Sequence, residues 1–231
     1  MSKLFLIIAI NFIIGALGIC FIVTKNPGVR THLLTKYMVY LLIVVFIFSV
    51  LQFFPKAFPF IALIIAGLGA IEILKLCNAF SFKCLMFFLS YMILAILFLF
   101  FSMASVYQVS MVFTIIIILD GYSQITGQLF GKYKMTPVIS PQKTWEGLIG
   151  GVLLTFIASF FLDLTNHKII IVSYIIFFGI IGDLSDSLIK RKAGIKDFGT
   201  ILPGHGGILD RFDSFILSGA MYYLLIKLHY V

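Results

Sequence analysis

Long apolar runs separated by short polar segments dominate this sequence. A helix that crosses the hydrocarbon core of a bilayer needs about 20 mostly apolar residues. Eight runs approach that length, and they cover residues 4–24, 37–54, 58–75, 83–103, 106–130, 145–163, 168–189 and 212–230. Backbone groups must be hydrogen-bonded in lipid, so each run is expected to be an α-helix. The pattern therefore predicts an all-α polytopic membrane protein with about eight transmembrane helices.

Composition supports a membrane protein and argues against a soluble domain. The 231 residues are 61% hydrophobic and 11% charged, whereas a soluble domain has roughly 25% charged residues. The first apolar run exceeds the roughly 7–15 residues of a signal-peptide core, so we expect a first transmembrane helix. The net charge of +8 does not indicate nucleic-acid binding, because basic residues commonly flank transmembrane helices. No nucleic-acid partner is expected.

The distribution of Lys and Arg predicts the orientation in the membrane. The loops after the first, third, fifth and seventh runs carry most basic residues, whereas the other side has only Lys3, Lys56, Lys168 and Lys227. Basic loops stay in the cytoplasm. We therefore expect a multi-pass cell-membrane protein with both termini non-cytoplasmic and its polar loops facing the cytoplasm.

The chain divides by character into two regions. Residues 1–105 form the first four apolar runs and contain a single acid, Glu72, three residues before Lys75. That spacing favours an ion pair at the end of a helix. Residues 106–231 contain the other eight acids and the Gly-rich polar loops. Any chemistry is therefore expected in the second region.

The motif D-x-x-D-S occurs twice, at residues 183–187 and 210–214. In the first copy the acids, the serine and Lys190 fall on one face of a helix. An acid inside or at the end of a membrane span usually faces a partner or a wet cavity. A simple alternative is an i,i+4 ion pair between Asp186 and Lys190.

A basic, Gly-rich loop joins the two copies, and Asp210 and Asp213 begin the last apolar run. Two acid pairs on neighbouring helices with Lys and Arg between them indicate a divalent metal site beside a phosphate site, since Mg²⁺ is typically held by a few carboxylates plus substrate phosphates. Asp120 lies deep in the fifth run. It begins a polar face of small residues suited to close helix packing, which continues through Ser123, Gln124, Gly127 and Gly131.

The second region resembles the phosphatidate cytidylyltransferases, also called CDP-diacylglycerol synthases. The segments that carry the resemblance are SLIKR (187–191), KD (196–197), PGHGGILDRFD (203–213), ISPQKTWEG (139–147) and GDL (182–184). Two positions depart from the family pattern. Ser123 and Gln124 stand where the family often has small and aromatic residues, and Asp186 stands where Glu is common.

The resemblance implies an integral-membrane enzyme of phospholipid biosynthesis that joins CTP and phosphatidate into CDP-diacylglycerol and diphosphate. A phosphate monoester is already an anionic nucleophile near neutral pH, so the main task is to position the phosphates and neutralise their charge. Mg²⁺ is the implied cofactor, with a second, monovalent cation as an addition. The lipid bilayer and a homodimer are the other implied partners.

The resemblance also implies roles for individual residues. Asp183 and Asp210 are the foremost metal ligands, followed by Asp213, Asp186 and Asp120. Lys190, Arg191, Lys143 and Arg211 would bind phosphates, and His205, Gly206 and Gly207 would shape the triphosphate loop. Ser140, Ser187 and Lys196 are the remaining predicted substrate contacts. The predicted catalytic group comprises Asp183, Asp210, Lys190, Arg191, His205 and Asp213.

Three other functions compete with this one. A CTP-dependent enzyme acting on an ether-linked or prenyl lipid phosphate would need the same charged residues. An ion-coupled transporter would use Asp120, Asp183 and Asp213 as an intramembrane path. A structural scaffold would leave the charged residues without a role.

Overall fold

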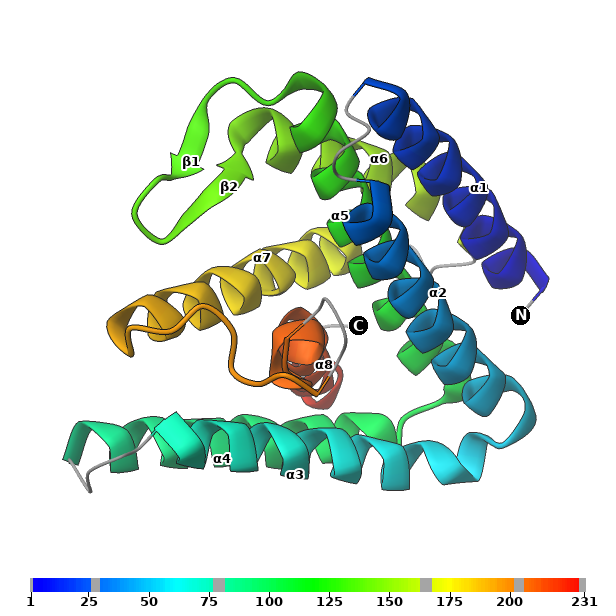
Figure 1. Ribbon diagram of the computed structural model, residues 1–231. Coiled ribbons are helices and arrows are strands. Elements are labelled where there is room, and N and C mark those ends of the chain that lie inside the picture. Colours follow the sequence, from blue (N-terminus) through cyan, green and yellow to red (C-terminus); the bar gives the residue numbers. More distant parts are fainter. Residues whose placement is uncertain (1, 26–29, 77–81, 163–167, 202–205, 229–231) are drawn as a thin grey trace.

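The protein is described by a computed structural model that places residues 2–25, 30–76, 82–162, 168–201 and 206–228 (Figure 1). Helices account for most of these residues. They are α1 (Ser2–Lys25), α2 (Arg30–Phe53), α3 (Phe58–Leu76), α4 (Phe82–Ser102), α5 (Val106–Phe130), α6 (Trp145–Ser159), α7 (Lys168–Lys192) and α8 (Leu209–Lys227). A short 3-10 helix, Pro55–Ala57, precedes α3, and two strands, β1 (Lys134–Thr136) and β2 (Ser140–Thr144), precede α6.

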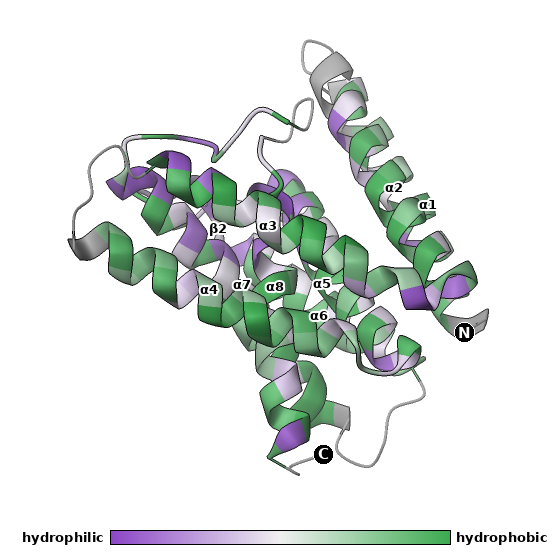
Figure 2. Cartoon of the chain, turned by 90° about the horizontal axis from the view of Figure 1, so that it is seen from below, coloured by the Kyte–Doolittle hydropathy of each residue, from purple (hydrophilic) through white to green (hydrophobic). Residues whose placement is uncertain are grey.

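Each of the eight predicted apolar runs overlaps one helix, so a mainly helical fold is confirmed for the described residues. The number of membrane spans and the side on which the termini lie stay predictions. Within the part of the chain that the structure describes, five segments are long and apolar enough to cross a membrane: Leu34–Phe53, Pro55–Leu76, Cys84–Ser102, Val106–Phe130 and Ile169–Lys192. The apolar stretches Leu6–Phe21 and Trp145–Ser159 are shorter. In Figure 2 the helices are mostly hydrophobic, and hydrophilic residues gather around β2.

Helix α8 lies at the centre of the bundle. It packs against α7, α4, α5 and α3, and Figure 1 shows it end-on between α7 and the antiparallel pair α3 and α4. A cluster of aromatic rings fills the space around it. The Phe215 ring lies 4.9 Å from that of Phe113 and 5.2 Å from that of Phe98, both edge-on. These contacts fix the position of the helix that begins with Asp210.

Small residues bring α7 and α8 into close contact. A side chain at Gly182 would come within 3.0 Å of the Ser214 Cα atom. The Ser214 and Ser218 hydroxyls donate hydrogen bonds to the carbonyls of Gly179 and Ile175. The Ser214 hydroxyl of the second D-x-x-D-S copy is therefore used between helices, because two helices packed this closely must pair their buried polar groups.

Helices α5 and α6 form the most extensive pair. The predicted small-residue face of α5 makes this contact, since a side chain at Gly127 would come within 3.2 Å of Thr144 Oγ1 and one at Gly147 within 2.8 Å of the Ser123 carbonyl. Thr144 caps α6 by accepting a hydrogen bond from the Gly147 amide. The prediction of close packing on this face is confirmed.

The antiparallel hairpin of β1 and β2 was not predicted from the hydropathy pattern. It pairs Lys134 with Thr144 and Thr136 with Ser140. The Tyr133 amide donates to the Glu146 carboxylate at 3.1 Å, and the Trp145 amide donates to the Tyr133 carbonyl. These bonds tie both ends of the hairpin to the start of α6, which gives Lys143 a defined position.

Candidate active site

Asp210 connects three segments at the start of α8. Its Oδ1 atom lies 2.6 Å from Lys190 Nζ of α7, and the Asp210 side chain is 1% exposed. Its Oδ2 atom accepts hydrogen bonds from the backbone amides of Phe198 and Gly207, both at 2.8 Å. Lys190 also lies 5.3 Å from the centre of the Phe198 ring. Asp210 therefore joins α7, α8 and the loop between them.

The i,i+4 alternative for Lys190 is wrong in this structure, because its ammonium group pairs with Asp210 rather than with Asp186. Both oxygens of Asp210 have hydrogen-bonding partners. The role of Asp210 as a metal ligand remains a prediction. In the structure, Asp210 holds Lys190 and the loop after α7 in place.

A second ion pair joins the hairpin to α7. Lys143 Nζ of β2 lies 2.5 Å from Asp183 Oδ2, and the side chains are 24% and 42% exposed. Arg191 reaches the hairpin from the end of α7, since its Nε donates to the Ile139 carbonyl at 2.9 Å. Residues far apart in the sequence, at 143 and 183, thus form one basic–acidic pair, in which the Asp183 side chain is exposed and the Lys143 ammonium nitrogen is buried.

Three carboxylates lie where α7 and α8 meet. The charges of Asp183, Asp186 and Asp213 act on one another electrostatically. Asp186 Oδ2 is buried and has no hydrogen-bond partner among the described residues, while Asp213 accepts a bond from the adjacent Ser214 amide. Within the described part of the chain, no three His, Cys, Asp or Glu side chains are grouped closely enough to hold a metal ion by themselves.

Asp120 and Arg211 line a small cavity between α2, α5 and α8, and the charges of Asp183 and Lys143 also act on Asp120. Both residues line it together with Tyr40 and mostly apolar side chains. Tyr40 donates its hydroxyl hydrogen to the Ile117 carbonyl at 3.2 Å. Asp120 and Arg211 are thus neighbours of a largely apolar space, and their charges also act on each other.

Glu72 occupies a different position from the one its sequence context indicated. The predicted helix-end ion pair with Lys75 is wrong, because Glu72 is only 2% exposed and bonds to backbone amides instead. Its two carboxylate oxygens accept hydrogen bonds from the Ile208 and Leu209 amides, at 2.9 and 2.8 Å. Sequence spacing gave no signal for this contact, since 136 residues separate Glu72 from Ile208.

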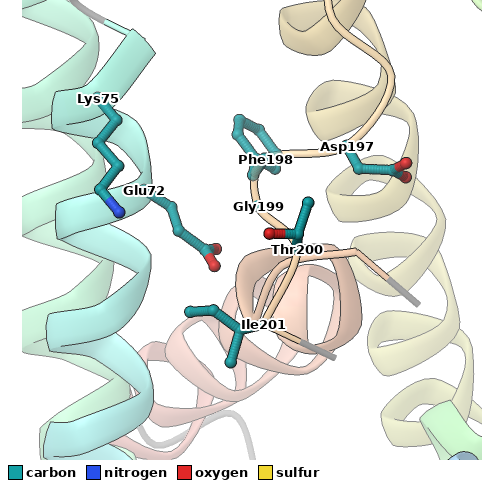
Figure 3. A pocket seen from close by; sticks show the side chains of 7 residues that line it. All are labelled: Glu72, Lys75, Asp197, Phe198, Gly199, Thr200 and Ile201. Carbon is teal, nitrogen blue, oxygen red and sulfur yellow. The ribbon is translucent and has the colours of Figure 1, made fainter. Parts of the chain in front are cut away.

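A pocket of about 410 Å³ opens beside Glu72 (Figure 3). It is lined by α3 and by the loop after α7, through Glu72, Lys75, Asp197, Phe198, Gly199, Thr200 and Ile201. Asp210 also contacts this loop, because its Oδ2 atom accepts a hydrogen bond from the Phe198 amide.

The remaining predicted residues occupy varied positions. Ser187 is buried and Ser140 partly buried, whereas Lys196 is exposed. Gly206 has a backbone φ of +86°, and a side chain there would come within 2.8 Å of Asp210 Oδ2. Only glycine fits this position without strain. His205 lies outside the described residues.

Comparisons with known proteins relate the whole chain to one family. A model described as the Cytidylyltransferase family matches residues 2–229. A protein of Staphylococcus haemolyticus named phosphatidate cytidylyltransferase is 49% identical over 111 residues, which cover 45% of this chain and 43% of that protein. Phosphatidate cytidylyltransferase 4, chloroplastic, of Arabidopsis thaliana is 43% identical over 122 residues, covering 50% of this chain and 31% of that protein. The matched stretch therefore spans less than half the length of these relatives.

Proposed function

Because the chain belongs to the Cytidylyltransferase family, we propose that it transfers the cytidylyl group of CTP to phosphatidate. In this reaction a phosphate oxygen of phosphatidate forms a bond to the α-phosphorus of CTP. The bond between that phosphorus and the α,β-bridging oxygen breaks, and diphosphate leaves with the electron pair. The products are CDP-diacylglycerol and diphosphate. The names of the similar bacterial and plant proteins support this substrate pair.

The observation that carries the proposal is the pair of Lys–Asp contacts at one end of the bundle. Lys143 with Asp183 and Lys190 with Asp210 place two ammonium groups beside carboxylates on adjacent helices. Phosphoryl-type transfer depends mainly on positioning and charge neutralisation. The site needs no Ser–His pair, because the phosphate monoester is already ionised near neutral pH.

The chain's own residues have distinct tasks in this mechanism. Lys143 is held by the hairpin and donates to phosphate oxygens, which reduces the repulsion between the two anionic substrates. Lys190 is held by Asp210 and contributes a second positive charge. The glycines of the loop after α7 let backbone amides approach the triphosphate. Arg191 and Arg211 complete the set of cations for the phosphates.

The carboxylates between α7 and α8 fit a hard divalent cation. Mg²⁺ prefers oxygen ligands and is typically bound through one or two carboxylates plus substrate phosphates, and Asp186 Oδ2 is a buried oxygen without a partner. One or two of Asp183, Asp186 and Asp213 would hold the ion together with substrate phosphates, since the three are not grouped closely enough to do so by themselves. Asp210 and Asp120 stay predicted as further ligands. When bound, Mg²⁺ would neutralise charge on the phosphate oxygens.

The membrane arrangement belongs to the same proposal. We place all eight helices across the bilayer, with the loops after α1, α3, α5 and α7 in the cytoplasm, where CTP is available. The excess of Lys and Arg in those loops supports this orientation. Phosphatidate would reach the carboxylates laterally from the lipid. Homodimerisation and a second, monovalent cation stay predictions from the resemblance.

Product identification tests this function. Purified protein would receive CTP, Mg²⁺ and a panel of phosphatidate, ether-linked and prenyl lipid phosphates, and the lipid product would be identified by mass. We expect CDP-diacylglycerol and an equal amount of diphosphate from phosphatidate. If product forms only from another lipid phosphate, that lipid and not phosphatidate is the substrate. If no lipid leads to diphosphate release, the proposed activity is refuted.

A further inference from the structure

Glu72 is a buried acid that the reaction described above does not use. It lies near the end of α3 and is 2% exposed. A buried carboxylate is unfavourable unless its oxygens are hydrogen-bonded, and here each oxygen accepts one backbone amide, from Ile208 and from Leu209. Both bonds are shorter than 3.0 Å.

The two amides are at the N-terminus of α8, where a helix has unpaired N–H groups and a partial positive charge. Ile208 stands at the N-cap position of α8, but its side chain makes no capping hydrogen bond. Glu72 therefore supplies from another helix the cap that α8 lacks. A carboxylate at this end is stabilised by the helix dipole, so the negative charge contributes as well as the acceptor atoms.

The loop backbone is fitted closely around the same carboxylate. A side chain at Gly199 would come within 2.8 Å of Glu72 Oε1, and one at Gly207 within 2.5 Å. The Gly207 amide in turn donates to Asp210 Oδ2. Glu72 thus contacts both sides of the loop that Asp210 closes.

We propose that Glu72 is a positioning residue: by holding the start of α8, it sets the place of Asp210 and hence of Lys190. Asp210 lies in the first turn of α8, one residue after Leu209, so a shift of the helix start moves its carboxylate directly. The Lys190–Asp210 pair would then lose its alignment with the substrate phosphates. This inference rests on the proposed cytidylyl transfer, and it gives the apolar N-terminal region a direct contact with the reactive region.

The test compares Glu72→Gln with wild type in CTP turnover with phosphatidate. Gln has the length of Glu but places an amide donor against one of the two backbone donors and removes the charge. A misplacement of about 1 Å lowers turnover by about 100-fold, so we expect kcat to fall by about 10- to 100-fold with a much smaller change in KM for CTP. Lys56→Gln, a loss of charge at the exposed start of the same helical segment, should leave kcat unchanged.

Hydrogen exchange separates positioning from a general loss of structure. In Glu72→Gln the amides of Ile208 and Leu209 should exchange faster, while those of α5 remain as in wild type. Unchanged kcat would overturn the inference, and so would a fall in kcat without faster exchange at these amides. If Glu72→Gln does not fold, Glu72→Asp, which keeps the charge but is too short to reach both amides, must show the same two effects. Wild-type protein that releases no diphosphate would refute the proposed function instead, and the exchange measurement would still test the helix cap.

Discussion

The substitution Asp210→Asn tests the buried connection between α7, α8 and their loop. Asn keeps an oxygen that can accept from the Phe198 and Gly207 amides, but its NH₂ group must then face Lys190. Lys190 would lose a carboxylate that lies 2.6 Å from its ammonium group, in a setting where the two side chains are only 13% and 1% exposed.

The expected loss follows from that burial. Removing one partner of a buried ion pair costs about 3–5 kcal/mol, because it leaves an uncompensated charge. Lys190 keeps some contact with solvent, so we expect the lower end, about 3 kcal/mol. That is a factor of roughly 100 in the ratio of folded to unfolded protein. Asp197→Asn, in an exposed position of the same loop, should change stability by no more than about 0.5 kcal/mol.

Unfolding in mixed micelles measures these changes. Trp145 is the single tryptophan of the chain, and it stands at the start of α6 beside the hairpin, so its fluorescence reports unfolding of the reactive half. Lys190→Met should lower the cost of Asp210→Asn when the two are combined, with a coupling of about 1–3 kcal/mol. A loss below about 0.5 kcal/mol for Asp210→Asn, or strictly additive single effects, would refute the claim that this pair is buried and coupled.

Three further predictions concern the same region. Lys143→Met should lower kcat/KM for CTP by about 100-fold, since a cation aimed at developing charge contributes about 3 kcal/mol; unchanged diphosphate release would exclude Lys143 from the site. Removing divalent ions with a chelator should stop CTP turnover and added Mg²⁺ should restore it, whereas full activity without the ion would remove the metal from the mechanism. Gly206→Ala should lower the free energy of unfolding by about 1–2 kcal/mol, because alanine is strained at the positive φ of this position. Gly121→Ala is the control, since a side chain there meets nothing within 4 Å.

Hydropathy alone located the helices of this protein. Each apolar run became one helix because a chain in lipid must satisfy its backbone within the segment. The same reasoning cannot detect short hairpins in polar loops, and β1 and β2 were missed for that reason. The family resemblance, based on segments such as 203–213, was confirmed by the match over residues 2–229.

The sequence also predicted the acids and lysines of the candidate site, but not their pairing. Local spacing offered Asp186 as an alternative partner for Lys190 and favoured Lys75 for Glu72, since neighbours on one helix are the only contacts that spacing can evaluate. In the folded protein Lys190 pairs with Asp210 and Glu72 caps α8. These contacts depend on how α3, α7 and α8 pack. The sequence therefore determined which residue types and helices are present, and only the tertiary structure decided which charges meet, because those partners come from separate helices.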